Sequence, residues 1–310
     1  MANLNTRSTP SSAVPHEPKD KVTLQVMSDL HLETPRYRPM YAQFNPQPSS
    51  PYLALLGDIG NAHDLRLYQF LREMLQKFDV VFYVFGNHEP YYHDSLDFET
   101  CTLQAAWTKM ENFEASISTR RATDDPSLGR FVFLNRRRFD LSDTVTLLGA
   151  TLFSNVRDDQ KRTVSLFMSD FSNISQWTVE VHNAMHQHDL RWLNSTVETM
   201  MREEPHRSVV ILTHFSPTAI PEANDPEHAD DERGVQSAFV TNLEKDICWT
   251  SPLVKVWAFG HTHFSCDFVD EKTGKRVVAN QRGYGIEDSF GFDACKTVTV
   301  QDSQQQPNAE

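Results

Sequence analysis

Three strand-length segments near the start of the chain are mainly apolar, and polar residues follow each of them at once. Tyr52–Leu56 and Val80–Phe85 show no polar alternation, and we assign Val22–Met27 to the same class. Because successive side chains of a strand point to opposite faces, a run without alternation indicates a strand that is buried on both faces. A sheet that is covered on both faces needs further layers against it. The three segments therefore predict a layered α/β fold.

Further segments continue this α/β pattern. Four more strands are predicted from β-branched and aromatic residues, at Phe131–Leu134, Thr144–Leu152, Ser208–Thr213 and Val254–Phe259. Apolar residues recur at helical spacing over Leu65–Phe78. A second helix is expected over 100–118. One or two more are expected within 176–203, with Trp192 and Leu193 on the buried side.

The two ends of the chain differ in composition from its middle. Residues 1–20 are polar and contain three prolines, and the segment 301–310 carries a run of three glutamines. We expect a flexible N-terminal arm, one domain over 21–300 and a disordered tail.

Composition and charge exclude several classes of partner. The chain has 310 residues and a formal net charge of −13, from 42 acidic and 29 basic residues. An acidic balance argues against nucleic acid and against an anionic membrane surface as partners. No apolar run approaches the ~18 residues that span a bilayer, and no apolar signal segment opens the sequence. The four cysteines lack metal-binding spacing, so we expect reduced thiols in a cytoplasmic protein.

Five of the predicted strands are followed at once by residues of the types that bind metal ions. They are Asp29 and His31, then Asp58, then Asn87, His88 and Glu89, then His214, and finally His261 and His263. Ligand sites of open α/β sheets assemble just beyond the carboxyl ends of the strands. Glycines at 57, 86 and 260 permit the sharp exits that such an edge needs. A sheet core gains nothing from these polar residues, so together they indicate a metal site.

These blocks resemble the calcineurin-like metallophosphoesterase superfamily. The family pattern is Asp-x-His, Gly-Asp, Gly-Asn-His-(Asp/Glu), a single His and Gly-His-x-His, and every block is present here in order. The match runs from about residue 22 to 285. The resemblance implies a four-layer α/β/β/α sandwich with two mixed central sheets and a dinuclear metal site.

The resemblance also implies a role for each residue of the pattern. The implied ligands are Asp29, His31 and His263 for one site, Asn87, His214 and His261 for the other, and Asp58 as a bridge. Imidazole, carboxylate and amide ligands suit two divalent or trivalent ions of Mn, Fe or Zn. A bridging water would then attack the phosphate as hydroxide. His88 is not a ligand in the family, and it is expected to contact the phosphate and protonate the leaving alkoxide.

Two departures from the pattern narrow the branch of the superfamily. Its protein phosphatases have Gly-Asp-x-Val-Asp-Arg-Gly and an Arg before Gly-Asn-His-Glu, whereas this chain has Gly60, Asn61 and Phe85 in those places. The missing arginines are the side chains expected to hold a phosphomonoester dianion. Gly-His-Thr-His resembles the small phosphodiesterase-like branch, and segments 183–193 and 280–284 resemble uncharacterised microbial members of it.

We therefore expect an enzyme that hydrolyses a small phosphodiester, or a phosphomonoester. The alternative from another class is a non-catalytic scaffold of the same fold, which is disfavoured because all seven ligands and His88 are present. A protein phosphatase is disfavoured by the missing arginines. A nuclease is disfavoured by net charge, although a metal site can locally override that charge.

Several residues outside the ligand set are candidates for a substrate wall. Four of them follow predicted strands or turns: Tyr91, Tyr92, Phe153 and Asn155. For the two tyrosines, the alternative is that they pack their own loop. Asn280, Arg282 and Tyr284 come late in the chain and are expected to orient the loop of His261 and His263 or to meet the leaving group.

Three further features are interpreted without a direct role in catalysis. His182, His186 and His188 share one helical segment and are placed on the surface or behind the ligands, since the implied ligand set is already full. The acidic stretch Pro221–Arg233 is expected to be a solvated loop, with a lid as the alternative. The run Arg136–Arg138 is interpreted as surface charge.

Overall fold

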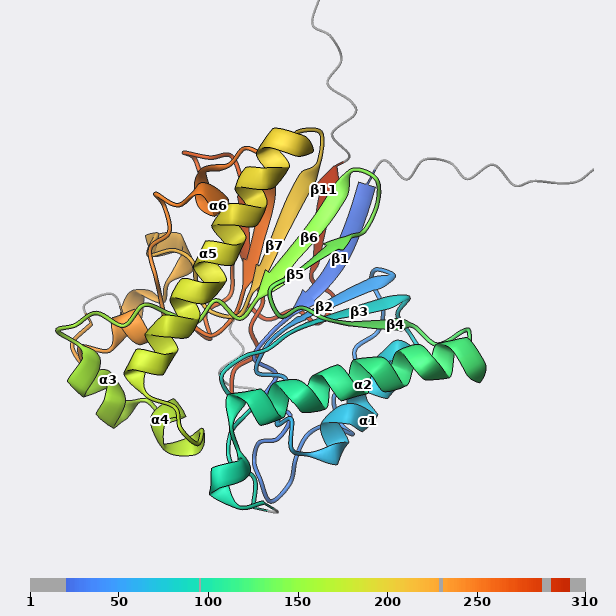
Figure 1. The fold of residues 1–310 in the computed structure, drawn as a ribbon, viewed down its shortest axis with the longest axis horizontal. Helices are drawn as coiled ribbons and strands as arrows, with labels where there is room; N and C mark the ends of the chain where they lie inside the picture. Colours follow the sequence, from blue (N-terminus) through green and yellow to red (C-terminus); the bar gives the residue numbers. More distant parts are fainter. Residues whose placement is uncertain (1–20, 95, 229–230, 286–290, 302–310) are drawn as a thin grey trace, which may run out of the picture.

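The computed structural model of the protein describes residues 21–94, 96–228, 231–285 and 291–301. Two β-sheets face each other at the centre, and helices cover the outer face of each (Figure 1). The fold is the predicted four-layer α/β/β/α sandwich with two mixed sheets. The predicted arm at 1–20 and the tail beyond residue 301 lie outside the described residues.

The first sheet joins the beginning of the domain to its end. Its strands are β1 (Lys21–Met27), β2 (Tyr52–Leu56), β3 (Val80–Val84), β4 (Arg130–Phe133) and β11 (Thr297–Gln301). They are ordered β11-β1-β2-β3-β4, and the four strands from β1 to β4 run parallel. β11 was not predicted. It pairs antiparallel with β1, with Gln301 opposite Lys21 at one end.

The second sheet is larger and carries an antiparallel strand at each edge. Its strands are β5 (Arg137–Asp140), β6 (Val145–Ala150), β7 (Ser208–Thr213), β8 (Val254–Phe259), β9 (Cys266–Val269) and β10 (Arg276–Ala279). The order is β5-β6-β7-β8-β10-β9. β6 was predicted to reach Leu152, but it ends at Ala150 because Leu152 and Phe153 adopt left-handed backbone, with φ of 73° and 40°.

Helices form the two outer layers. They are α1 (Leu65–Leu75), α2 (Leu103–Thr123), α3 (Lys161–Phe167), α4 (Asp170–Asn173), α5 (Val179–Glu203) and α6 (Ile247–Thr250). α1 and α2 lie against the first sheet and α5 against the second (Figure 1). The three long helices begin at capping side chains, because Asp64, Thr102 and Thr178 each accept a hydrogen bond from a first-turn N–H.

The hydrophobic core has two compositions. Between the sheets it consists mainly of aliphatic side chains, such as Val26, Leu147 and Val256. Beneath the helices it contains large aromatic side chains, such as Phe131 and Trp257. Flat aliphatic strand faces bring the sheets together, and the aromatic side chains fill the space under the rounded helices.

One polar side chain lies inside the first sheet. Gln25 in β1 is fully buried, and its amide donates to the carbonyls of Gln47 and Ala294 while its oxygen accepts from the Ser49 N–H. Because these groups are paired, β1 is buried on both faces despite the polar residue.

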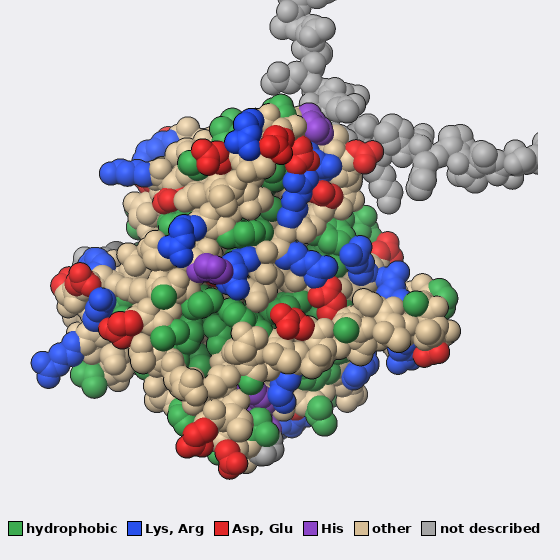
Figure 2. Space-filling view, in the orientation of Figure 1, with side chains coloured by type: hydrophobic (Ala, Val, Ile, Leu, Met, Phe, Trp, Pro, Cys, Tyr) green, Lys and Arg blue, Asp and Glu red, His purple; other side chains and the backbone are tan. Residues whose placement is uncertain are grey.

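The arginine run connects helices to a sheet edge. Arg136 pairs with the buried Asp189 of α5 at 2.6 Å, Arg137 with Glu114 of α2, and Arg138 with Glu204 at the end of α5. The interpretation as surface charge is therefore wrong for Arg136, because its partner lies in the interior. On the face drawn in Figure 2, basic and acidic side chains are interspersed.

Two further observations concern membranes and thiols. Among the described residues, no helix is both long and apolar enough to cross a membrane. All four cysteines are free, and Cys101 and Cys248 are buried.

Candidate metal centre

The residues predicted as ligands gather where five parallel strands end. They lie in the segments that follow β1, β2 and β3 of one sheet and β7 and β8 of the other. Ser28 joins the two sheets at this edge, because its N–H donates to the Asn280 carbonyl and its carbonyl accepts from the Arg282 N–H. The end of β1 is thereby held next to the segment that follows β10.

Five of the seven predicted ligands have a left-handed backbone. The φ angles are 53° at Asp29, 44° at His31, 53° at Asp58, 72° at His261 and 53° at His263. This conformation costs a non-glycine residue on the order of 1 kcal/mol, and such residues concentrate at functional sites. The sharp exit from each strand turns these side chains toward a common point.

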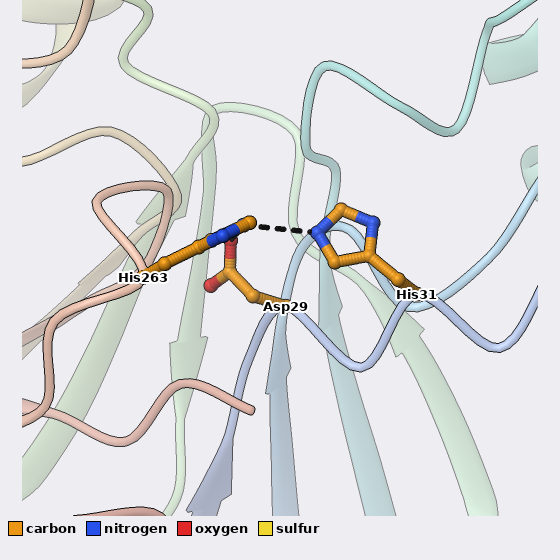
Figure 3. Close-up of side chains that lie close together, drawn as sticks. All are labelled: Asp29, His31 and His263. Atoms are coloured by element: carbon orange, nitrogen blue, oxygen red, sulfur yellow. Dashed lines mark hydrogen bonds and ion pairs between the residues drawn. The ribbon is translucent and has the colours of Figure 1, made fainter. Parts of the chain in front are cut away.

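Asp29, His31 and His263 form the first cluster of side chains. Their ligand atoms lie within 4.8 Å of one another, and Figure 3 shows all three side chains directed to one place. The two imidazole Nε2 atoms are 3.0 Å apart, and Asp29 Oδ1 is 3.5 Å from His263 Nε2. His31 Nδ1 faces Glu33 at 3.4 Å. If Nδ1 carries the proton, the Nε2 lone pair faces the other ligands.

Asp58, His214 and His261 form the second cluster. Their ligand atoms also lie within 4.8 Å of one another, and all three side chains are buried. His214 Nδ1 donates to the Leu56 carbonyl at 2.8 Å, which leaves Nε2 facing Asn87 Oδ1 at 3.0 Å and Asp58 Oδ1 at 3.5 Å. Acceptor atoms that converge without a donor between them fit a cation.

Asn87 is oriented by a buried carboxylate that the sequence analysis missed. Its Nδ2 donates to Asp170 Oδ1 at 2.8 Å, so Oδ1 of the amide faces His214. Tyr91 also donates to Asp170. An amide held in this way presents its oxygen to the centre, as a metal ligand must.

Asp58 connects the two clusters and the predicted acid. Its Oδ2 is 3.9 Å from Nε2 of both His31 and His88, and its Oδ1 accepts the backbone N–H of His88. Burial opposes the charged carboxylate, but His214 and His88 outweigh it and hold the pKa of Asp58 well below its ordinary value. This carboxylate thus lies 3.9 Å from His31 of the first cluster and 3.5 Å from His214 of the second. Glycine is required nearby, since a Cβ on Gly86 would collide with this carboxylate.

His88 lies beside the centre next to Glu33, a second residue that the sequence analysis missed. His88 Nδ1 is 3.6 Å from Glu33 Oε1, and its ring stacks on Tyr91 at 4.2 Å. Burial opposes charge on His88, but Asp58 and Glu33 outweigh this and raise its pKa to about 9. A protonated imidazole that faces the centre through Nε2 is able to act as an acid.

Gln281 positions the loop of His261 and His263. Its Oε1 accepts the His263 N–H at 2.6 Å, and its Nε2 donates to the Thr262 hydroxyl and to the Phe264 carbonyl. The sequence analysis named its neighbours instead. Asn280 donates to the Val26 carbonyl and Arg282 to the Leu30 carbonyl, so both hold the exit of β1.

The histidines of α5 are buried and support the segment after β6. His182 Nε2 accepts the Ser154 N–H, and His186 Nδ1 lies 3.0 Å from the Leu152 carbonyl. A surface position is therefore wrong for this pair, each of which is 1% exposed. Since they contact backbone of the next layer, they lie behind the ligands. His188, which is exposed, is the member of the set on the surface.

The predicted substrate wall is only partly correct. Phe153 is buried against Trp177 and Phe215 and does not face the site. Tyr91 is buried and packs its loop, while Tyr92 is half-buried. The side chain of Asn155 is exposed, and the backbone N–H of this residue donates to the Thr241 hydroxyl.

Two cavities adjoin the centre. The first, about 430 Å³ and called here the His88 cavity, is lined by His88, Glu33, Arg36, Arg66, Tyr91 and Tyr92 among others. The second, about 340 Å³ and called the Phe239 cavity, is lined by Thr262, Phe239, Val235, Glu227 and Asp231 among others. The acidic stretch Pro221–Arg233 contains two short turns, Pro221–Ala223 and Pro226–His228, and several of its residues after Ala223 border this second cavity. Residues 229–230 of that stretch lie outside the described residues.

Comparisons with known proteins agree with this architecture. A sequence profile described as calcineurin-like phosphoesterase matches residues 23–265. An uncharacterised protein of Acanthamoeba polyphaga mimivirus is 25% identical over 287 residues, which is 85% of this chain and 92% of that protein. Among solved structures, a phosphopantetheinyl hydrolase from Mycobacterium tuberculosis is similar with a TM-score of 0.63 at 16% identity, covering 93% of this chain and 99% of that one. At that identity the likeness concerns the fold.

Proposed function

The chain belongs to the calcineurin-like phosphoesterase family, and from this premise we propose that it hydrolyses small phosphodiesters at a dinuclear metal centre. The family supports a metal-dependent phosphoesterase. The choice of diester, the identity of the ions and the role of each residue are our proposals.

One observation carries the proposal above the others. Two clusters of ligand atoms, Asp29/His31/His263 and Asp58/His214/His261, lie at one edge with acceptor atoms directed inward. The ligand groups in these clusters are imidazoles and carboxylates, with the amide of Asn87 beside them. No thiolate takes part, and this set of ligands suits Mn, Fe or Zn. Two such ions bound together supply an acidified water and neutralise charge on the phosphoryl oxygens.

The residues of the chain supply the remaining chemistry. Asp58 would bind both ions and fix their spacing. His88, held by Glu33 and stacked on Tyr91, would donate its Nε2 proton to the departing ester oxygen. His31 and Asn87 would keep their orientation through Glu33 and Asp170.

Two observations favour a diester over a monoester. Each nearby guanidinium already has an acceptor in the protein: Arg282 donates to the Leu30 carbonyl, and Arg36 and Arg66, at the rim of the His88 cavity, pair with Asp94 and Asp64. A diester, which carries a single negative charge, needs fewer such groups than a monoester dianion. The two separate cavities also match the two ester arms of a diester.

The test combines metal analysis with two substrates. Protein reconstituted with Mn, Fe or Zn should hold about two ions per chain and should hydrolyse bis-p-nitrophenyl phosphate faster than p-nitrophenyl phosphate. Chelation should abolish both reactions. A finding of at most one ion would contradict the dinuclear site, and faster hydrolysis of the monoester would contradict the diester assignment. No hydrolysis of either ester by the two-ion protein would contradict the enzymatic function itself.

A further inference from the structure

Tyr284, which the sequence placed either beside the loop of His261 and His263 or at the leaving group, lies over the first ligand cluster. Its ring stacks on His31, with centroids 4.2 Å apart and planes 29° apart, and its edge meets His263 at 4.8 Å. It follows Gly283, whose φ is 72°, and Arg282, which is anchored to the Leu30 carbonyl. Two imidazoles and the preceding backbone therefore hold the ring in place, although Tyr284 is 51% exposed to solvent.

The hydroxyl of Tyr284 lies close enough to His88 for both to contact one ester oxygen of a substrate. It is 3.1 Å from Nε2 of His88, the atom that would give its proton to the leaving group. A tyrosine hydroxyl carries its proton at neutral pH and is able to donate a hydrogen bond. An acceptor oxygen about 2.8 Å from both donors completes a triangle with ordinary hydrogen-bond lengths. His88 and Tyr284 are therefore able to hold the same oxygen.

The charge of this second donor is relevant to the substrate. A guanidinium would pair with two oxygens of a dianion, but the nearby Arg282 is occupied by the Leu30 carbonyl and lies over the Phe44 ring. A phenol brings a hydrogen bond without charge. An uncharged donor beside His88 suits a monoanionic ester, because such an ester carries less charge to neutralise and still has to be oriented.

We propose that Tyr284 is a catalytic residue that donates a hydrogen bond, together with His88, to an ester oxygen of a bound phosphodiester. The inference rests on the proposed function, because it takes the phosphate to lie between the ligand clusters and His88. It assigns to a neutral side chain the contact for which other members of the superfamily, such as the protein phosphatases, are expected to use arginine.

The experiment compares Tyr284→Phe with Tyr37→Phe. Phenylalanine keeps the ring over His31 and removes only the hydroxyl, while Tyr37 is 90% exposed and serves as the matched control. Zinc-loaded proteins with equal metal content are titrated with diethyl phosphate, a monoanionic diester, and binding is followed by phosphorus NMR. Hydrolysis of bis-p-nitrophenyl phosphate is measured on the same samples.

We expect Tyr284→Phe to weaken diethyl phosphate binding by about fivefold to tenfold, the loss of one hydrogen bond. The rate on bis-p-nitrophenyl phosphate should fall by no more than this factor, because p-nitrophenolate needs little help from a donor as it leaves. Tyr37→Phe should match the wild type in both. If Tyr284→Phe binds diethyl phosphate as the control does, the inference is overturned, whatever the rate. If the wild type binds the diester but hydrolyses nothing, the proposed function fails while the binding comparison still decides the role of Tyr284.

Discussion

Two pairs of closely spaced histidines differ in what surrounds them. One pair is His182 and His186 of α5, and the other is His261 and His263 of the loop after β8. The helix pair is buried, and one ring nitrogen of each histidine, Nε2 of His182 and Nδ1 of His186, faces backbone N–H or carbonyl groups of residues 152–154. The loop pair faces carboxylates and other imidazoles, although Nε2 of His261 also lies 3.4 Å from the Ala238 carbonyl. His261 is in addition enclosed by the rings of Phe215 and Phe239.

The comparison shows that partners, and not spacing, decide what a histidine pair does. A nitrogen that is hydrogen-bonded to backbone is committed, and a helix brings it there rigidly. The loop pair has left-handed backbone at both residues, which turns two side chains only two positions apart toward the same centre. A nitrogen that faces only acceptors is available for an ion.

The largest change should come from removing the carboxylate that serves both clusters. Asp58→Asn should lose both ions and reduce hydrolysis to the level of chelated protein, because it weakens each cluster and the bridge between them. Asp29→Asn should mainly empty one site. Metal analysis and rates of the two variants, with the exposed Asp143→Asn as a control, test this. Loss of the same single ion in both would contradict the bridging role.

Alanine variants of the two histidine pairs should differ in what they lose: metal ions for the loop pair and stability for the helix pair. His263→Ala should leave about one ion per chain with little effect on unfolding by urea. His186→Ala should keep about two ions per folded chain but lower the free energy of unfolding by about 2 kcal/mol, since it leaves buried backbone carbonyls unpaired. If His186→Ala loses an ion without losing stability, the division between the pairs is wrong.

A third histidine, His88, tests a role that needs no ion. His88→Ala should keep its metals and lose roughly 10²–10⁴-fold in rate, the range that general acid catalysis supplies. An alkoxide needs a proton as it leaves, whereas p-nitrophenolate needs little help. The loss should therefore be large for alkyl esters and small for nitrophenyl esters. Equal losses for both would assign His88 to phosphate binding alone.

The smallest effect concerns stability and pH. Burial lowers the pKa of His182 to about 3 and also lowers that of His186. Because the unfolded chain binds these protons near pH 6.5, each of these two groups should lower the free energy of unfolding as pH drops below 6.5, by up to about 1.4 kcal/mol per pH unit. His88, whose pKa is raised, acts in the opposite direction, so the loss is measured as the difference between wild type and His182→Gln in urea unfolding of chelated protein at pH 7.5 and 5.5. His182→Gln should show a smaller loss than wild type, and an equal loss would contradict the assignment.

The sequence identified the polar side chains that gather at the strand ends better than it predicted the sheets. Ligand positions follow directly from strand ends, because parallel strands deliver them to one edge. β9 was missed because its side chains are partly exposed, and β5 because its four residues are mostly polar. Strands of this kind form only when a neighbouring strand is already in place, so their sequences carry little signal.

The missed site residues share one property. Glu33, Asp170 and Gln281 act through other side chains, and each lies in a segment that reads as an ordinary polar loop. For Glu33 the available signal was its position two residues after His31, which places a carboxylate beside the predicted ligands. The surface alternative was wrong for the helix pair because a polar helix face usually meets water, whereas here it meets the backbone of residues 152–156.

The pairing of β11 with β1 has a consequence for synthesis on the ribosome. β1 is made near the start and β11 near the end, so one edge of β1 stays unpaired until almost the whole domain has emerged. An open strand edge invites pairing with other chains. β1, which leads to Asp29 and His31, therefore keeps this edge open while the strands between β1 and β11 are made, and the nascent chain would gain most from a chaperone during that interval.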